Sequence, residues 1–312
     1  MPAFPRSLAS TTRVTALSLT IFGVAGHSQA SVVPAHEHVV VVIMENKSAD
    51  QVRTQPYTAA LQKRGATFTR SFAVTHPSQP NYLALWAADL LGVYDNTCPA
   101  PGVPLMAENL GHACERAGIR WRAYTEDLPM AGSDTCSSEG NASAGLYTRK
   151  HEPWTDFGNL DHANERPYRD LAADIAAGRL PRLAFVIPNN CHNSHDATVA
   201  GCSAADADAW LSKALPPLLD AVGPRGLVIL TWDEDDGSAG NHVLTVLAGG
   251  LVTPGAQSSR PITHYTVVRT ICDALGIAPF GRAVAETPID SVWVRPVSPS
   301  DHTGSVSGTR ER

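Results

Sequence analysis

Short apolar runs alternate along the chain with longer segments whose apolar residues recur at helical spacing. The runs are rich in Val, Ile and Leu and are followed by polar residues, which is typical of strands buried on both faces of a parallel sheet. We predict strands at residues 38–43, 119–124, 183–187, 226–232 and 243–248. We predict a helix that begins near residue 48 and further helices at residues 82–91, 206–222 and 265–275.

Local signals refine these elements. Ser48 is a favoured N-cap residue type, and Gly276 closes the last helix. Pro216 and Pro217 are expected to kink or interrupt the helix predicted at residues 206–222. Because strands alternate with helices throughout, we predict a single α/β domain with a mainly parallel central sheet and helices on both faces.

Both ends of the chain are predicted to lie outside this domain. Two Arg residues precede the apolar segment at residues 14–25, and a small-x-Ala cleavage pattern ends at Ala30. This arrangement is typical of a secretory signal peptide, which we assign to residues 1–30. The domain is then predicted at residues 31–295, and residues 296–312, rich in Ser and Thr, are predicted to form a flexible tail.

Charge and hydropathy narrow the class of protein. Two of the 24 Lys and Arg residues and none of the 30 Asp and Glu residues lie within residues 1–30, so the remainder carries a net charge of −8. A nucleic-acid-binding protein usually shows a basic patch, and this balance gives no sign of one. After residue 30 no run of about 18 apolar residues occurs, so we expect no transmembrane segment. A secreted or periplasmic protein is predicted.

The six Cys residues all follow the predicted signal peptide. They are Cys98, Cys114, Cys136, Cys191, Cys202 and Cys272. An even number in an exported protein indicates disulfides, and the lack of a CxxC motif argues against a zinc ribbon or a thioredoxin-like site. Six Cys allow fifteen pairings. We predict the short loop Cys191–Cys202 first and Cys98–Cys114 second, with a free buried thiol as the alternative for each.

Four acidic residues, Asp233, Glu234, Asp235 and Asp236, follow directly after the strand predicted at residues 226–232. The carboxyl end of such a strand is where open α/β sheets build their sites. Adjacent carboxylates repel one another, and a bound cation or several hydrogen-bond donors would relieve that repulsion. The alternative is an acidic turn exposed to solvent, which we expect for Asp235 and Asp236.

Polar residues also follow two other predicted strands. Glu45 and Asn46 follow the first strand, and His195 and Asp196 lie beyond the third. Since strand carboxyl ends face one edge of a doubly wound sheet, these groups are expected to converge with the acidic run. Carboxylate and amide oxygens are hard ligands suited to Mg²⁺, Ca²⁺ or Mn²⁺. Taken singly, each pair could be an ordinary turn after a strand.

Ser78 lies at the start of a predicted helix, between Pro77 and Pro80. A helix N-terminus favours an anion such as phosphate, and a metal ion lowers the pKa of a hydroxyl, so Ser78 is a candidate nucleophile. The alternative is a simple N-cap. For His242 and for residues 149–151, a basic run, the alternative is a solvated surface position.

Five motifs occur along the chain in a fixed order, and together they resemble one family. They are Met44–Ser48, Thr75–Tyr82, Tyr147–Pro153, Pro188–Asp196 and Thr231–Glu234. The set is similar to the phosphoesterase family of secreted acid phosphatases and bacterial phospholipases C, over residues 38–289. The resemblance implies an alkaline-phosphatase-like fold, and the short chain is most similar to the small acid phosphatases.

The resemblance also implies roles for individual residues. The implied ligands of a divalent metal ion, whether Mg, Ca, Mn or Zn, are Glu45, Asn46, Ser78, Asp233 and Glu234. The implied catalytic residues are Ser78, the nucleophile that forms a phosphoserine, with His151, His195 and His242. The implied substrate contacts are His76, Asn81 and Asp196.

The predicted function is hydrolysis of phosphate monoesters by a secreted acid phosphatase. Small phosphorylated molecules or phospholipid head groups, including phosphoinositides, are the expected substrates. A phospholipase C-type phosphodiesterase is the alternative enzyme. A cation-dependent binding protein without catalysis is the alternative of another class.

Overall fold

The computed structural model describes residues 32–138, 145–195 and 202–294. Its strands are β1 (His38–Met44), β2 (Ala66–Phe68), β3 (Ser71–Phe72), β4 (Trp121–Thr125), β5 (Glu165–Pro167), β6 (Leu183–Ile187), β7 (Gly226–Trp232), β8 (Thr245–Ala248), β9 (Gln257–Ser258) and β10 (Ile262–Thr263). Its α-helices are α1 (Ala49–Val52), α2 (Pro56–Arg64), α3 (Ser78–Ala87), α4 (Leu110–Arg116), α5 (Arg169–Ala176), α6 (Ala204–Val222) and α7 (His264–Leu275). Short 3₁₀ helices are η1 (Arg149–His151), η2 (Pro153–Asp156), η3 (His162–Asn164) and η4 (Gly281–Ala285).

Eight strands form one sheet in the order β5-β4-β6-β1-β7-β8-β2-β9. Neighbouring strands are parallel, except that β8 runs antiparallel to both β7 and β2. The strands β1, β6 and β7 lie at the centre and are buried along their length, which explains their nearly continuous apolar sequences. The predicted mainly parallel sheet is confirmed.

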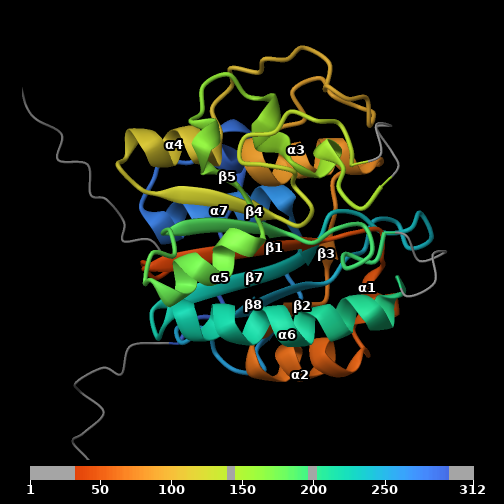
Figure 1. Ribbon diagram of the computed structural model, residues 1–312. Coiled ribbons are helices and arrows are strands. Elements are labelled where there is room, and N and C mark those ends of the chain that lie inside the picture. Colours follow the sequence, from red (N-terminus) through yellow and green to blue (C-terminus); the bar gives the residue numbers. More distant parts are fainter. Residues whose placement is uncertain (1–31, 139–144, 196–201, 295–312) are drawn as a thin grey trace, which may run out of the picture. The chain divides into compact units, whose positions relative to one another are not determined.

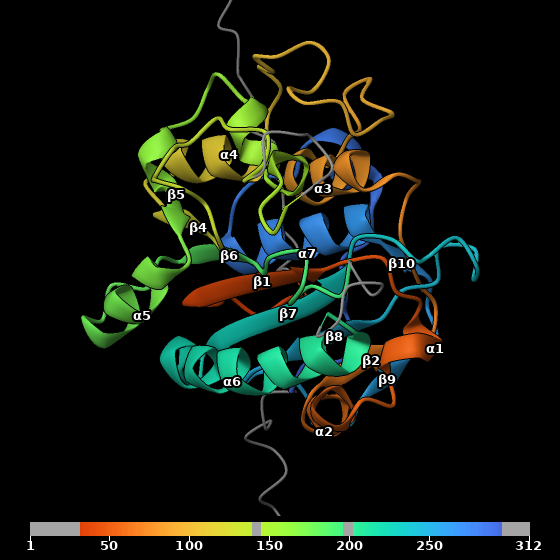
Figure 2. The same ribbon diagram turned by 45° about the vertical axis from the view of Figure 1, so that its right-hand side comes forward.

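Helices cover both faces of the sheet, as predicted (Figure 1). Side chains alternate between the faces of β1, so Val39, Val41 and Ile43 pack into the core that includes α3, α4 and α7. Val40 and Val42 pack into the core that includes α6. Figure 2 shows α7 and α6 on opposite sides of the strands. Each face therefore buries its own apolar layer.

The helix α3 begins four residues earlier than predicted, at Ser78, and ends at Ala87. Pro77 is its N-cap and Pro80 lies in its first turn, where a missing N–H leaves no hydrogen bond unmade. Every residue of α3 is buried. Ser78 is thus the first helical residue rather than the N-cap, and the fold fixes it beneath other elements.

The helix α6 runs without a break through Pro216 and Pro217, so the predicted interruption is wrong. The two prolines remove the N–H groups that would have reached the carbonyls of Ser212 and Lys213. Both of these residues are exposed, and water can hydrogen-bond their carbonyls. The exposed side of the helix therefore tolerates the two missing bonds.

Two disulfides are present among the described residues. Cys191–Cys202 is confirmed, whereas the predicted Cys98–Cys114 pair is wrong because Cys98 bonds to Cys136. Cys114 lies on α4 and points into the apolar core, where burial raises the pKa of its thiol to about 12. A thiol in that position is out of reach of the loop that carries Cys98.

Within the described ranges no helix combines the length and the apolar character that crossing a lipid bilayer requires.

Candidate active site

The carboxyl ends of β1 and β7 bring two acidic segments together. The strands pair in parallel with Met44 opposite Trp232, so Glu45 and Asp233 leave the sheet side by side. The backbone N–H of Asp233 donates to the carbonyl of Met44 at 2.9 Å. The backbone N–H of Asn46, at a positive φ of 51°, donates to Asp233 Oδ1 at 3.2 Å. The predicted convergence of these two strand ends is what the structure shows.

Ser78 lies between two of these carboxylates. Its Oγ is 3.2 Å from Glu45 Oε2 and 3.1 Å from Glu234 Oε1. The serine is 1% exposed, and both acids are buried. A hydroxyl carries one proton, so it donates to one carboxylate at a time while the other stays within reach. The hydroxyl therefore has two acceptors for its proton.

The three buried carboxyl groups do not share one protonation preference. Burial, followed by the charges of Glu45 and Glu234, raises the pKa of Asp233 well above its ordinary value. Burial and the charge of Glu45 raise the pKa of Glu234 to about 8. Burial alone would also raise the pKa of Glu45, but His151 and Lys150 beside it lower that pKa below its usual range. Of the three carboxyl groups, Glu45 thus has the strongest preference for the ionised form, and Asp233 and Glu234 favour the protonated form.

A basic side faces this acidic side. His151 Nε2 lies 2.9 Å from Glu45 Oε1, and its ring stacks on Tyr82 with centroids 4.9 Å apart. The ring of His195 lies 5.9 Å from that of His151, and Lys150 Nζ is 3.2 Å from His195 Nε2. The alternative interpretation of residues 149–151 as a solvated basic turn is wrong, because all three residues are buried and η1 packs against α3.

His76 and Asn81 contact the acidic run from the other direction. His76 Nδ1 lies 2.8 Å from Glu234 Oε2, and its Nε2 lies 3.1 Å from Asp235 Oδ1. Asn81 Nδ2 donates to Glu234 Oε2 at 3.3 Å and to the carbonyl of Thr75 at 2.8 Å. The His76 side chain is 44% exposed, so it forms a solvent-facing edge of the cluster.

Asp235 and Asp236, the last two residues of the acidic run, were both expected to be exposed to solvent, and the structure separates them. Asp235 is buried, and its carboxylate accepts from the backbone N–H groups of Gly237, Ala239 and Asn241, in addition to His76. These donors close the turn, so the expectation of solvent exposure is wrong for Asp235. Asp236 is exposed, as predicted.

Two predicted residues are not joined to the cluster by described contacts. His242 Nε2 lies 3.1 Å from the Thr69 carbonyl, and its ring lies 5.4 Å from Phe72. None of the contacts described for His242 reaches the carboxylates. Asp196 lies outside the described residues.

Sequence reasoning missed three residues that border the site. His264 is buried, and its Nε2 lies 2.6 Å from the Asp233 carbonyl oxygen. Lys150 and Tyr82 were also given no role. The sequence held a signal for His264, because this residue directly precedes the helix predicted at residues 265–275. In an α/β fold the start of a helix lies near an end of the sheet, where sites form. The other two follow or precede predicted site residues in the same motifs.

The residues present fit a divalent cation, although in the described chain no three His, Cys, Asp or Glu side chains are already arranged as metal ligands. The donor atoms at the cluster are hard oxygens of Glu45, Asp233, Glu234 and Ser78. Asp233 Oδ2 is buried without a hydrogen-bond donor among the described residues. A cation would satisfy that oxygen and reduce the repulsion among three buried carboxyl groups.

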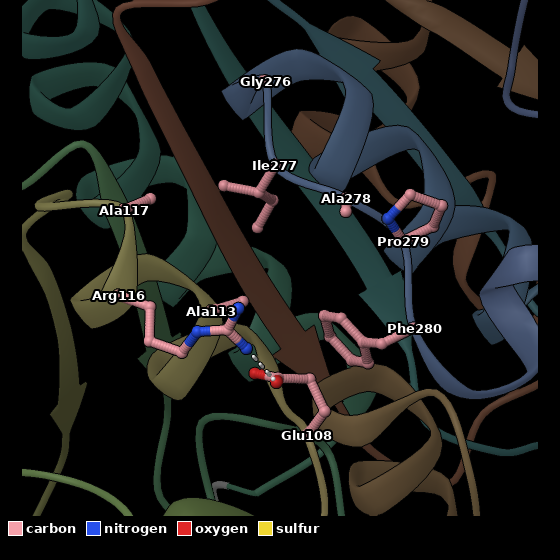
Figure 3. A pocket seen from close by; sticks show the side chains of 9 residues that line it. All are labelled: Glu108, Ala113, Arg116, Ala117, Gly276, Ile277, Ala278, Pro279 and Phe280. Carbon is pink, nitrogen blue, oxygen red and sulfur yellow. Dashed lines mark hydrogen bonds and ion pairs between the residues drawn. The ribbon is translucent and has the colours of Figure 1, made fainter. Parts of the chain in front are cut away.

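A hollow of about 450 Å³ lies elsewhere, between α4 and the segment after α7. Figure 3 shows Glu108 and Arg116 paired at one side of it and Ile277 and Phe280 at the other. Its lining includes none of the strand-end residues. The candidate site at the ends of β1 and β7 is therefore separate from this hollow.

Comparisons with known proteins identify the family of the chain. A model of the phosphoesterase family matches residues 51–278. A phosphatidylinositol-3-phosphatase of Mycobacterium tuberculosis is 38% identical over 85% of each chain. A probable acid phosphatase of Kluyveromyces lactis is 30% identical over 74% of this chain and 55% of its own length.

Solved structures share the fold at low identity. A protein of the alkaline phosphatase superfamily from Vibrio parahaemolyticus aligns with a TM-score of 0.53 and 14% identity, over 84% of this chain and 73% of its own. The lipoteichoic acid synthase LtaP of Listeria monocytogenes aligns with a TM-score of 0.57 and 12% identity, over 84% and 76%. The alkaline-phosphatase-like fold expected from the motifs is confirmed.

Proposed function

The chain belongs to the phosphoesterase family, and on this premise we propose that it is an exported enzyme that hydrolyses phosphate monoesters with Ser78 as nucleophile. One observation carries the assignment of the nucleophile. The Ser78 hydroxyl lies at the start of a buried helix and within 3.2 Å of two carboxylates. A serine so placed can lose its proton and meet a phosphoryl group at a helix N-terminus.

The substrates we propose are phosphate monoesters of small molecules and of lipid head groups. The Mycobacterium tuberculosis relative is named for a phosphoinositide, and three further relatives are named acid phosphatases. The proposed export is supported by two disulfides, which persist in oxidising compartments.

The proposed reaction starts with proton transfer from Ser78. Glu45 and Glu234 are the acceptors in reach, and Glu45 Oε1 lies 2.9 Å from His151 Nε2. The serine oxygen then attacks phosphorus in line with the leaving oxygen, forming a phosphoserine that water hydrolyses. The positive end of the α3 helix dipole is suited to the negative charge that develops on the phosphoryl oxygens, while the Gln79 N–H already donates to Asn96 Oδ1 and Pro80 has no N–H.

A divalent metal ion would be held by Glu45, Asn46, Ser78, Asp233 and Glu234. Bound there, it would supply charge stabilisation at a phosphoryl oxygen and lower the pKa of the serine hydroxyl. The orphaned Asp233 Oδ2 and the raised pKa values of Asp233 and Glu234 support such a cation.

On the leaving-group side we propose His195 as general acid. A protonated imidazole is common at acid pH, which agrees with an acid optimum. We retain Asp196 and His242 as proposed members of this side, and His76 and Asn81 as proposed substrate contacts that also bind Glu234.

The phosphodiesterase alternative has weaker support. A phospholipase C of Mycobacterium tuberculosis matches only 43% of this chain and 24% of its own length, at 29% identity. A binding protein without catalysis would not require Ser78 to lie between two carboxylates. The placement of Ser78 therefore favours a catalyst over a binding protein, and the short match to the phospholipase C favours the monoesterase over the diesterase.

Hydrolysis rates on matched esters test the proposal. We expect a higher kcat/KM for p-nitrophenyl phosphate than for its bis-ester or for phosphatidylcholine. Ser78→Ala is expected to lower kcat by about 10⁴-fold or more, since a nucleophile has no substitute. Ser212→Ala, an exposed position on α6, is the matched control and should leave the rate unchanged.

Two results would contradict the proposal. A faster reaction on the diester would assign the enzyme to the phosphodiesterases. Equal rates for Ser78→Ala and wild type, with both proteins folded by circular dichroism, would remove Ser78 from the chemistry.

A further inference from the structure

Lys150 is a buried cation to which the proposed reaction gives no role. It lies in η1 and is only 4% exposed. Placing an ammonium group in the interior is costly unless it is paired or serves a function. In this molecule the lysine does not approach a carboxylate within ion-pair distance among the described residues, in contrast to the buried Arg149 beside it, which pairs with Asp156 at 2.7 Å.

The hydrogen-bond partner of Lys150 is an imidazole and not a carboxylate. Its Nζ donates to His195 Nε2 at 3.2 Å, and this is the hydrogen bond found for it in the described chain. An ammonium group has three N–H donors, so two remain for another acceptor. A site that holds an unsatisfied cation next to an imidazole is suited to an anion.

A short series of contacts connects the segment of Lys150 to the proposed nucleophile, Ser78. The next residue, His151, contacts Glu45, which in turn contacts Ser78. The charge of Lys150 acts on Glu45 and on Glu234, since it lowers the pKa of each. The lysine is thus on the basic side of the same site, facing the carboxylates that surround Ser78.

We propose that Lys150 binds a non-bridging oxygen of the substrate phosphoryl group and thereby selects monoesters over diesters. The inference rests on the proposed function. Above about pH 6 a phosphate monoester carries two negative charges, whereas a diester carries one. The additional anionic oxygen of the monoester is the acceptor that the free N–H groups of Lys150 require.

The test compares p-nitrophenyl phosphate with bis(p-nitrophenyl) phosphate at pH 7. Lys150→Met is expected to lower kcat/KM for the monoester about 100-fold, as for the loss of one charge-stabilising donor, and for the diester by less than about 5-fold. The inhibition constant of inorganic phosphate should rise about 100-fold. Lys213→Met, which removes an exposed lysine of α6, is the matched control and should change none of these values.

Two further variants keep the test decisive if Lys150→Met fails to fold. Lys150→Gln, which retains polarity without the charge, should show the loss expected of Met, and Lys150→Arg, which retains the charge, should preserve the preference for the monoester within about 10-fold. Equal losses on both esters in the folded variants would overturn the proposal, because a lysine that only offsets the charge of Glu45 and Glu234 affects both reactions alike. Unchanged inhibition by phosphate would overturn it as well.

Calorimetry separates this inference from the proposed function. If the wild type hydrolyses neither ester, the phosphatase proposal fails. The affinity of inorganic phosphate for wild type and for Lys150→Gln still decides whether Lys150 binds a phosphoryl anion: a difference of about 100-fold supports the inference, and equal affinities refute it.

Discussion

Two buried aspartates of this protein have opposite surroundings. Asp174, on α5, accepts hydrogen bonds from the Tyr124 hydroxyl at 2.8 Å and from the guanidinium groups of Arg122 and Arg179. Asp233, after β7, lies beside two other carboxyl groups, and its Oδ2 has no donor among the described residues. Both are at most 5% exposed.

Their protonation preferences differ accordingly. Burial alone would raise the pKa of both carboxyl groups. At Asp174 the hydrogen bonds from Tyr124 and Arg122 outweigh burial, and the pKa falls below its ordinary value. At Asp233 the neighbours are anions, which add to the effect of burial, and the pKa rises. Burial of an acid therefore does not mark a site by itself, whereas burial among like charges does.

The largest expected effect is on activity, at Asp233. Asp233→Asn removes a proposed metal ligand, so we expect kcat/KM for p-nitrophenyl phosphate to fall about 10³-fold and divalent cations to bind less tightly. Because the substitution also removes repulsion in the metal-free protein, thermal stability without metal should be unchanged or higher. Steady-state kinetics, calorimetric titration of Mg²⁺, Ca²⁺, Mn²⁺ and Zn²⁺, and melting curves in a chelator measure the three quantities. Wild-type activity that survives complete chelation would refute the metal site.

Asp174→Asn should give the reverse pattern. It removes the charge that Arg122, Arg179 and Tyr124 contact, and we expect a loss of about 2 kcal/mol in the free energy of unfolding. Activity on p-nitrophenyl phosphate should stay within about 2-fold. Urea unfolding measures the first quantity, and a large loss of activity in the folded variant would contradict the distinction between the two aspartates.

The smallest expected effect is on stability, at His36. This residue lies outside the acidic cluster, so it shows what burial does to a pKa without several neighbouring charges. This residue is buried against Trp293, with ring centroids 5.4 Å apart, and burial lowers its pKa to about 4. Between pH 6.5 and 4 the unfolded chain binds more protons at this position, so stability falls as the pH falls through that window. From pH 6.5 to 5.5 we expect a loss of about 1 kcal/mol from this residue.

His36→Phe should remove that contribution. Urea unfolding at pH 6.5 and 5.5 would then show a smaller difference for the variant than for wild type. An equal difference in the two proteins would show that the burial of His36 does not govern its protonation.

Much of the site was predictable because its residues follow strands. Glu45, Asp233 and Glu234 come directly after strongly apolar runs, and a parallel sheet places such strand ends at one edge. Ser78 was predictable as the residue between two prolines at a helix start. What failed was local detail, as at Asp235, where an exposed turn was expected and three backbone N–H donors enclose the carboxylate.

Basic residues were harder to place than acidic ones. For the basic run at residues 149–151 the sequence left two interpretations open, a solvated surface turn and a place for His151 in the site. The structure buries it beneath α3, where His151 stacks on Tyr82 and contacts Glu45. Such contacts join residues about 70 to 106 positions apart, which local patterns do not record.

The sequence by itself determined the parallel sheet, the acidic strand ends, the candidate nucleophile and the family, since each depends on periodicity or on short motifs. The tertiary structure alone decided which groups are buried together. It paired Cys98 with Cys136, enclosed Asp235 and brought Lys150 to His195. The physical reason is that burial and charge balance depend on neighbours supplied by distant segments, and only the folded chain brings those neighbours within a few ångströms.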